Sequence, residues 1–188
     1  MKTNVRMRGT GRASQVSEAL DGAKTMDTKQ LPQAASRESQ MRTTLANLAE
    51  EDARLRLPIL EAASIAARLC LDPSDLELRQ RAAKIWARID SVIARHLSKE
   101  ESAVLPWAES LKDFPHQLVD RARKKHEQMI ALHDIIATHS FEKGRDQDIA
   151  AEARNLCVYA TTLDDLIAGE ERDLFPVMRR VLFRHPQS

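Results

Sequence analysis

The sequence has few of the residues that sheets and tight turns require. Only five of its 188 residues are glycine, and tyrosine, phenylalanine and valine are scarce. Alanine, leucine, arginine, glutamate and lysine are abundant instead, and these residues favour helix over strand. A chain of this length can bury one sizeable core. We therefore predict a single all-α domain.

The chain also lacks a marked excess of charge of either sign and any long apolar run. Its formal net charge is +1 with 30% charged residues, which gives no general basic surface for nucleic acid, so we expect no nucleic-acid partner. No stretch approaches the roughly eighteen apolar residues that span a bilayer, and the basic start is not followed by an apolar signal core. We expect a cytoplasmic protein without membrane contact.

Cysteine is nearly absent. Cys70 and Cys157 lie far apart and form no C-x-x-C motif. This usage is typical of a reducing compartment, with two buried thiols as the expected state and a single disulfide as the alternative.

The chain divides into an amino-terminal segment and a helical domain. Residues 1–34 contain three of the five glycines and few large apolar residues, which predicts a flexible arm. Residues 35–184 show apolar positions at spacings of three and four, in four blocks separated by the turn signals LDPSD, KDFPH and FEKGRD. Four helices with short connections predict an up-down-up-down four-helix bundle. Ser74 or Asp75 is expected to cap the second helix.

Each predicted helix carries a titratable residue on its apolar face. Burying an isolated carboxylate or imidazole costs several kcal/mol unless it is paired or bound to metal, so the set calls for one common explanation. Imidazole together with carboxylate suits iron, manganese or zinc. Two alternatives stay open: a one-residue rotation of the first helix would replace Asp52 with Glu51, and the histidines would pair with glutamates in a metal-free polar core. The inward-facing residues are Asp52, His96, Glu100, His126 and Glu170.

Two segments seventy residues apart repeat part of this pattern. HLSKEESAVLP (96–106) and LIAGEERDLFP (166–176) share two consecutive glutamates and a proline, but Leu166 stands where His96 would recur. The repeat indicates that the second and fourth helices are equivalent, so that the bundle consists of two hairpins related by a pseudo-twofold axis.

With these motifs the chain resembles the hemerythrin-like, or HHE cation-binding, family over residues 40–182. HLSKEESAVLP corresponds to the family's H-x-x-x-E on the second helix, KKHEQM to its third-helix histidine at His126, and GEERDLFP to the end of its fourth helix. The resemblance implies a four-helix bundle and non-haem iron. It also implies that Glu100 and Glu170 are the carboxylates that bridge two irons in the family.

The sequence departs from the family pattern at three positions. Asp52 stands in place of the first-helix histidine, Ile130 in place of a second third-helix histidine, and Leu166 in place of the fourth-helix histidine. The resemblance then implies one iron position served by Asp52, His96, Glu100 and Glu170, and a second that keeps only His126 and the bridges. We expect one or two iron ions in a reduced, carboxylate-rich site.

The sequence favours a non-enzymatic metal-binding protein. It shows no nucleophile, phosphate loop or acid/base pair outside the bundle core. By resemblance, the iron would sense or handle oxygen, nitric oxide or peroxide, with the metal ion and a small diatomic ligand as partners. The alternative is a metal-free protein of the same fold that regulates a protein partner.

Overall fold

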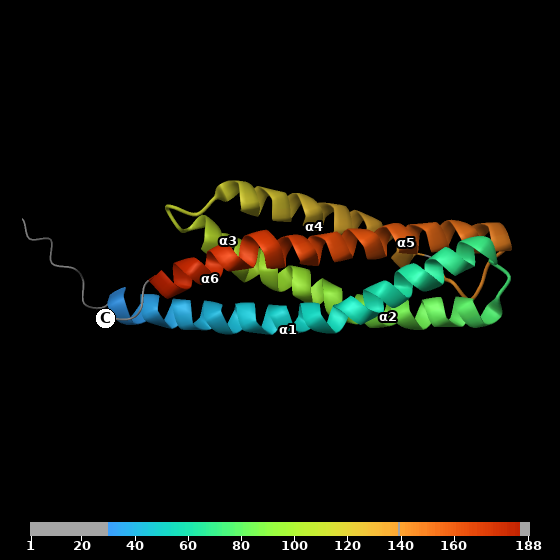
Figure 1. The fold of residues 1–188 in the computed structure, drawn as a ribbon, viewed down its shortest axis with the longest axis horizontal. Helices are drawn as coiled ribbons and strands as arrows, with labels where there is room; N and C mark the ends of the chain where they lie inside the picture. The colour runs from blue at the N-terminus through green and yellow to red at the C-terminus, as the bar shows by residue number, and fades with distance from the viewer. Residues whose placement is uncertain (1–29, 139, 185–188) are drawn as a thin grey trace, which may run out of the picture. The chain divides into compact units, whose positions relative to one another are not determined.

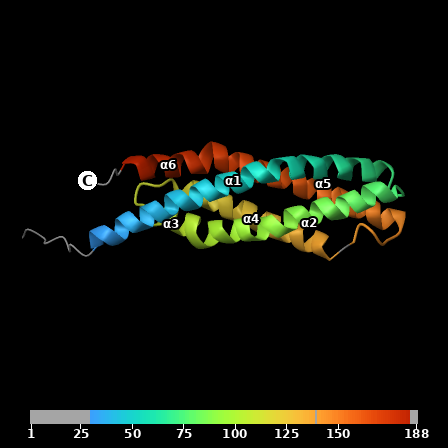
Figure 2. The same cartoon turned by 90° about the horizontal axis from the view of Figure 1, so that it is seen from below.

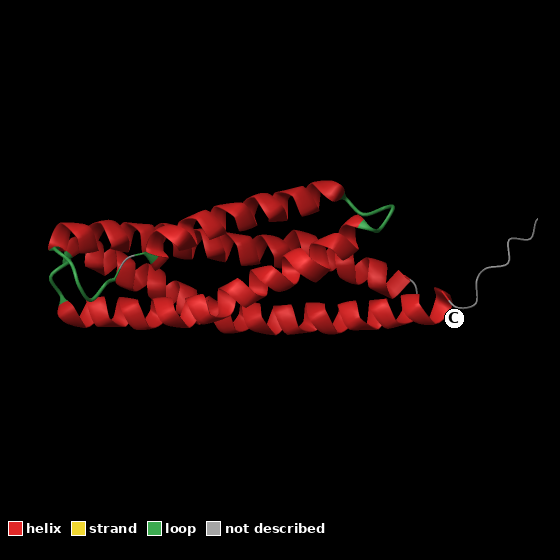
Figure 3. Cartoon of the chain, turned by 180° about the vertical axis from the view of Figure 1, so that it is seen from behind, coloured by secondary structure: helices red, strands yellow, loops and turns green. Residues whose placement is uncertain are grey.

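The computed structural model describes residues 30–138 and 140–184, and every regular element within those ranges is a helix. No described helix combines the length and the apolar character that crossing a bilayer would need. Figure 3 shows the described chain as helices joined by loops. The elements are α1 (Gln30–Leu71), α2 (Leu76–Lys99), the π-helix η1 (Glu100–Val104), α3 (Leu105–Glu109), α4 (His116–Ala137), α5 (Asp146–Gly169), the π-helix η2 (Glu170–Leu174) and α6 (Phe175–Arg184).

These elements form the predicted four-helix bundle, because α2, η1 and α3 follow one another without a break, as do α5, η2 and α6. The three turns fall at the predicted signals. Figures 1 and 2 show the α1–α2 and α4–α5 connections at one end of the bundle and the α3–α4 connection at the other. Successive helices therefore run antiparallel, and the predicted all-α fold is confirmed.

The predicted flexible arm, residues 1–34, lies outside the described residues as far as position 29. Residues 30–34 form the beginning of α1, so this helix starts five residues before the predicted domain boundary.

Local sequence signals fix the ends of the helices. Asp75 is the N-cap of α2, and its Oδ1 accepts a hydrogen bond of 3.0 Å from the backbone N–H of Leu78, as predicted. Arg79 links the α1–α2 connection to the α4–α5 connection. Its guanidinium donates to the carbonyls of Pro73 and Gly144 and to the carboxylate of Asp146. This arginine is only 7% exposed, and these three acceptors take the place of water as its hydrogen-bond partners.

Pro58 lies inside α1. It cannot donate a backbone hydrogen bond, and its ring crowds the carbonyl four residues earlier, which bends a helix. Figure 1 shows α1 changing direction in its cyan part, near this proline. The bend follows the residues that contribute to the site described below.

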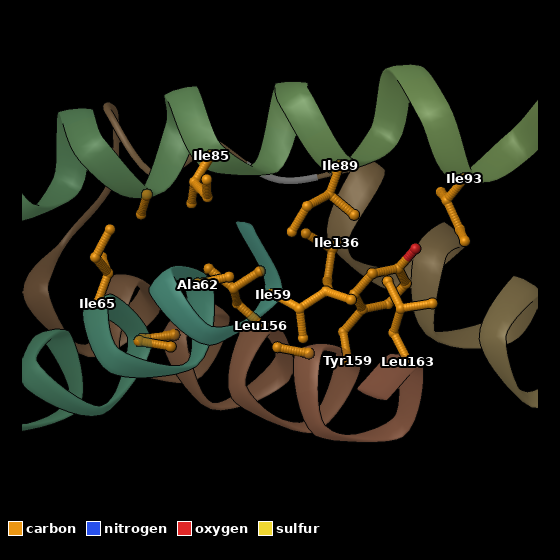
Figure 4. Close-up of a cluster of buried hydrophobic side chains, with 14 of the residues drawn as sticks. Ile59, Ala62, Ile65, Ile85, Ile89, Ile93, Ile136, Leu156, Tyr159 and Leu163 are labelled. Carbon is orange, nitrogen blue, oxygen red and sulfur yellow. The ribbon is translucent and has the colours of Figure 1, made fainter. Parts of the chain in front are cut away.

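Two apolar clusters fill the bundle, one on each side of a polar layer. The cluster towards the α1–α2 turn includes Ile59, Ile89, Leu156 and Tyr159 (Figure 4). The other cluster includes Leu48, Val104 and Phe175, drawn from the opposite half of the helices. Burying this apolar surface is the main favourable term in folding. The polar layer that separates the two clusters contains the candidate site.

Candidate metal centre

All five residues singled out in the sequence lie in the polar layer. Asp52 follows Leu48 of one cluster and precedes Leu55 of the other, and the remaining four occupy corresponding places in the other helices. Their exposed fractions are 0% for Asp52, His96 and Glu100, 1% for His126 and 3% for Glu170. Each of the four helices of the bundle therefore contributes at least one buried titratable side chain to this layer.

Both π-helices begin at a glutamate of the polar layer. The N–H of Leu105 donates to the carbonyl of Glu100, and the N–H of Phe175 donates to the carbonyl of Glu170, each five residues back. The following residues, Pro106 and Pro176, have no N–H to continue an α-helical ladder. The structure thus reproduces the sequence repeat as two matching irregularities of the backbone, and π-bulges occur frequently at functional sites.

The wider π turn keeps residues spaced by four on one face. In an α-helix a step of four residues rotates the side chain about 40° beyond a full turn. His96, Glu100 and Val104 follow that spacing, and all three are buried. A π turn contains more residues than an α-helical turn, so it compensates for this 40° rotation. The ligand-type residues and the apolar residues that follow them therefore face the same core.

The five side chains converge in two overlapping groups. Asp52, His96 and Glu170 form one group, and Glu100, His126 and Glu170 form the other, with the ligand-type atoms of each group within 4.8 Å of one another. Nε2 of His96 lies 3.3 Å from Oδ1 of Asp52, and Nε2 of His126 lies 3.1 Å from Oε2 of Glu100. Glu170 belongs to both groups, and its Oε1 is 3.4 Å from Nε2 of His126.

The arrangement distributes the carboxylates more evenly than the family resemblance implied. Glu100 was expected to bridge both iron positions, but its oxygens lie closer to His126, at 3.1 Å, than to His96, at 3.7 Å. Each imidazole therefore has two carboxylates within its own group. One ion or two ions can be placed with these side chains.

A second carboxylate orients each imidazole from outside. Nδ1 of His96 lies 3.3 Å from Oε2 of Glu51, and Nδ1 of His126 lies 2.6 Å from Oε1 of Glu101. These contacts leave both Nε2 atoms directed into the layer. A carboxylate that holds the far nitrogen of a histidine fixes its tautomer and ring orientation and is a regular feature of metal sites.

Each outer carboxylate is adjacent in sequence to an inner one and is paired with a cation. Glu51 accepts from Lys99, Glu101 lies 3.7 Å from Arg123, and Glu171 is paired with Arg56. The consecutive acids therefore divide their roles, one pointing inward and one pointing to a basic residue. The role of the outer members was not predicted from the sequence. The doubled acids at 51–52, 100–101 and 170–171 are the signal that identifies them.

The question of whether Asp52 or Glu51 faces the core is settled by the geometry. Asp52 is completely buried and directed at Nε2 of His96, while Glu51 contacts the opposite nitrogen of the same ring. Both acids are used, and no rotation of the helix is needed.

Several polar atoms inside the layer have no hydrogen-bond partner within the described residues. They include both oxygens of Asp52, both oxygens of Glu100, one oxygen of Glu170 and Nε2 of His96. A buried polar group without a partner costs roughly 1–3 kcal/mol, and more when it is charged. Such orphans are rare in folded proteins, and here they share one layer. Oxygens of three carboxylates and two imidazole nitrogens are a donor set that fits a divalent transition-metal cation.

Burial and the closeness of the carboxylates also shift the pKa values of the layer. Burial and the neighbouring charges of Glu170 and Glu100 raise the pKa of Asp52 to about 8. Burial and the charge of Glu170 raise the pKa of Glu100 to about 8 as well. Burial lowers the pKa of His96. For His126 burial acts in the same direction, but Glu100 and Glu170 outweigh it and raise the pKa to about 10. Without a cation, the layer holds its carboxylates together by retaining protons.

One position assigned by the resemblance is wrong. Ile130 was expected where a second histidine of the third helix would face the metal, but its side chain is 51% exposed. Ala122 lies four residues before His126 in the sequence and is buried, with 6% exposure. It lies beside Leu166 and Glu170, where the three residues line a small cavity of about 40 Å³. Ala122 and Leu166 are therefore the positions where further ligands would reach the layer.

His133 lies apart from the centre. Its Nε2 is 2.6 Å from Oδ1 of Asp90, and its ring packs against Trp86 with a centroid distance of 5.4 Å. The side chain is 28% exposed. It is satisfied by these neighbours at the edge of the bundle, and it contributes nothing to the polar layer.

Helical bundles that bind metal ions build their sites from carboxylates and imidazoles of facing helices, as in this layer. The sequence of residues 40–178 matches the hemerythrin HHE cation binding domain. The chain therefore belongs to that family, and its membership implies cation binding. Comparisons with curated proteins and with solved structures gave no match.

Proposed function

We propose that this protein binds one or two non-haem iron ions through Asp52, His96, Glu100, His126 and Glu170. The bound iron supplies an open coordination position, through which the protein senses or handles oxygen, nitric oxide or peroxide. We further propose that the protein is not an enzyme. Three carboxylates and only two imidazoles would hold the metal, which leaves room for water or a small ligand.

One observation carries the proposal. Two groups of one imidazole and two carboxylates share Glu170, and most of their inward atoms have no hydrogen-bond partner among the described residues. A protein core that keeps several unsatisfied polar groups at one point is costly unless a cation joins them. The outer carboxylates Glu51 and Glu101 already orient both imidazoles towards that point.

Metal analysis of the purified protein tests the proposal. Protein produced with added iron should contain about one ion per chain or more, and the iron-loaded form should melt at a higher temperature than the stripped form, because a ligand that binds only the folded state stabilises it. Addition of nitric oxide to the ferrous protein should change its visible spectrum. Less than about a tenth of an ion per chain after reconstitution, with no change in melting temperature, would sink the proposal.

Three alanine variants locate the ion. His96→Ala and Glu100→Ala each remove an inward ligand and should lower metal content sharply. His133→Ala serves as the matched control, since this histidine is held by Asp90 outside the polar layer. Loss of metal in His133→Ala alone would show that the binding site lies elsewhere.

The alternative function, a metal-free regulator of a protein partner, is favoured by the absence of imidazole at Ala122 and Leu166, both buried beside Glu170. The same experiment separates the two functions. A folded protein that takes up no metal under any loading condition would support the regulator.

A further inference from the structure

A second concave site lies outside the metal centre, in the seam between α2 and α4. It is a cavity of about 260 Å³ with a mainly apolar surface, and the polar residues Ser98, Glu101 and His133 also line it. Ile93 and Met129 form its interior and are essentially unexposed, at 1% and 0%. Ile130, which is 51% exposed, and the exposed Ala94 border it on the outside. The cavity therefore opens to solvent at one side and reaches the buried core at the other.

Tyr159 of α5 also lines the cavity. This residue is 1% exposed, and its ring is held edge-on against Trp86 with a centroid distance of 5.1 Å. Figure 4 shows its hydroxyl directed towards Ile93, a residue of the cavity wall. Among the residues that the structure describes, no group forms a hydrogen bond with this hydroxyl.

A buried tyrosine normally finds a partner for its hydroxyl. The hydroxyl is not among the fully enclosed polar atoms that lack a partner, and Tyr159 lines a cavity that is open to solvent. Water can accept from the hydroxyl there, and a molecule that carries an acceptor can take the place of that water. Apolar cavities of roughly 150 Å³ are large enough to hold benzene. The present volume suits a ring of six atoms with a small polar substituent.

We propose that this cavity binds a small, uncharged, mainly apolar molecule that carries one hydrogen-bond acceptor, with Tyr159 as the donor. The site does not depend on the proposed iron. It lies beside the metal centre all the same, because Glu101 borders the cavity and holds His126 at 2.6 Å. An occupant would therefore contact the carboxylate that orients one of the proposed metal ligands.

Cyclohexanone and methylcyclohexane are suitable probes, since they have similar size and only the ketone accepts a hydrogen bond. Binding is followed on the full-length protein by NMR of labelled isoleucine and methionine methyl groups. The methyl signals of Ile93, Met129 and Ile130 should shift in a saturable manner with both probes, while that of the distant Ile65 should not. The ketone should bind about three- to tenfold more tightly, the contribution of one net hydrogen bond.

Three variants make the test specific. Tyr159→Phe keeps the ring and its packing and should abolish the preference for the ketone while retaining binding of the hydrocarbon. Ala94→Trp fills the opening and should prevent binding of both probes. Ala87→Trp, at another exposed position of α2 outside the cavity, is the matched control and should bind as the parent does.

The proposal is overturned if neither probe gives a saturable shift at the three cavity methyl groups. Binding that survives Ala94→Trp unchanged would place the probes elsewhere. A ketone preference that persists in Tyr159→Phe would remove the assigned donor. The experiment is done on stripped and on iron-loaded protein, so a failure here is distinguishable from a failure to bind metal.

Discussion

The polar layer makes the stability of the metal-free protein depend on pH in an unusual direction. The pKa of Asp52 and that of Glu100 rise from ordinary values of 3.8 and 4.5 to about 8. Between these limits the folded protein keeps two protons that the unfolded chain has lost. Stability therefore falls as pH rises through this window. His126 acts in the same sense above 6.5, because its pKa rises to about 10.

Within the polar layer, one group opposes this trend. The pKa of His96 is lowered from 6.5, so below that pH the unfolded chain binds the extra proton. The net excess on the folded protein is about one proton from pH 5.5 to 6.5, and up to about three above it. At about 1.4 kcal/mol per proton and pH unit, the metal-free protein should lose about 3 kcal/mol between pH 5.5 and 7. For a domain of this size that is a fall of about 6–12 °C in melting temperature.

Calorimetry or circular dichroism of chelator-stripped protein at constant ionic strength measures this fall. Iron-loaded protein should not show it, because the metal replaces the protons and requires ionised carboxylates. Asp52→Asn should make the stripped protein more stable at pH 7 and flatten its pH dependence. Glu127→Gln, an exposed change on α4, should leave the slope as it is. A melting temperature of stripped protein that stays constant or rises from pH 5.5 to 7 would refute the assigned protonation of the layer.

Three further outcomes follow from the geometry. Leu166→His restores an imidazole at a buried position and should raise metal content towards two ions per chain, as measured by elemental analysis, whereas Ile130→His on the exposed side of α4 should not. Glu101→Gln weakens the support of His126 and should reduce metal affinity about 10- to 100-fold in a competition titration with a chelator. Arg79→Met leaves carbonyl acceptors without their donor and should lower the unfolding free energy by about 2–4 kcal/mol in urea melts without altering metal content.

The residues of the polar layer were accessible from the sequence because they are a local property of each helix. Apolar spacing of three and four fixes which face of a helix is buried, and Asp52, His96, His126 and Glu170 interrupt that face. The turn signals are equally local, which is why Asp75 was identified as a cap. Shared spacing in the two EE-x-x-x-(L/F)-P segments placed the second and fourth helices in equivalent positions.

The partners of those residues were decided by tertiary structure. Periodicity gives the direction of a side chain but not the rotation and separation of neighbouring helices, which are set by packing across the core. Ile130 was therefore placed at the metal by its four-residue spacing from His126, although it faces outward. For the same reason the pairing of Glu100 with His126, and the support of both imidazoles by Glu51 and Glu101, required the assembled bundle.

The sequence by itself determined that the protein is a bundle of four helices with one titratable layer, because helix formation and burial depend on neighbours along the chain. Only the tertiary structure decided that the layer forms two groups joined at Glu170, with outer acids paired to basic residues on other helices. It also decided that residues of α2, α4 and Tyr159 of α5 line one cavity. These features depend on distances between helices, which no spacing within one helix contains.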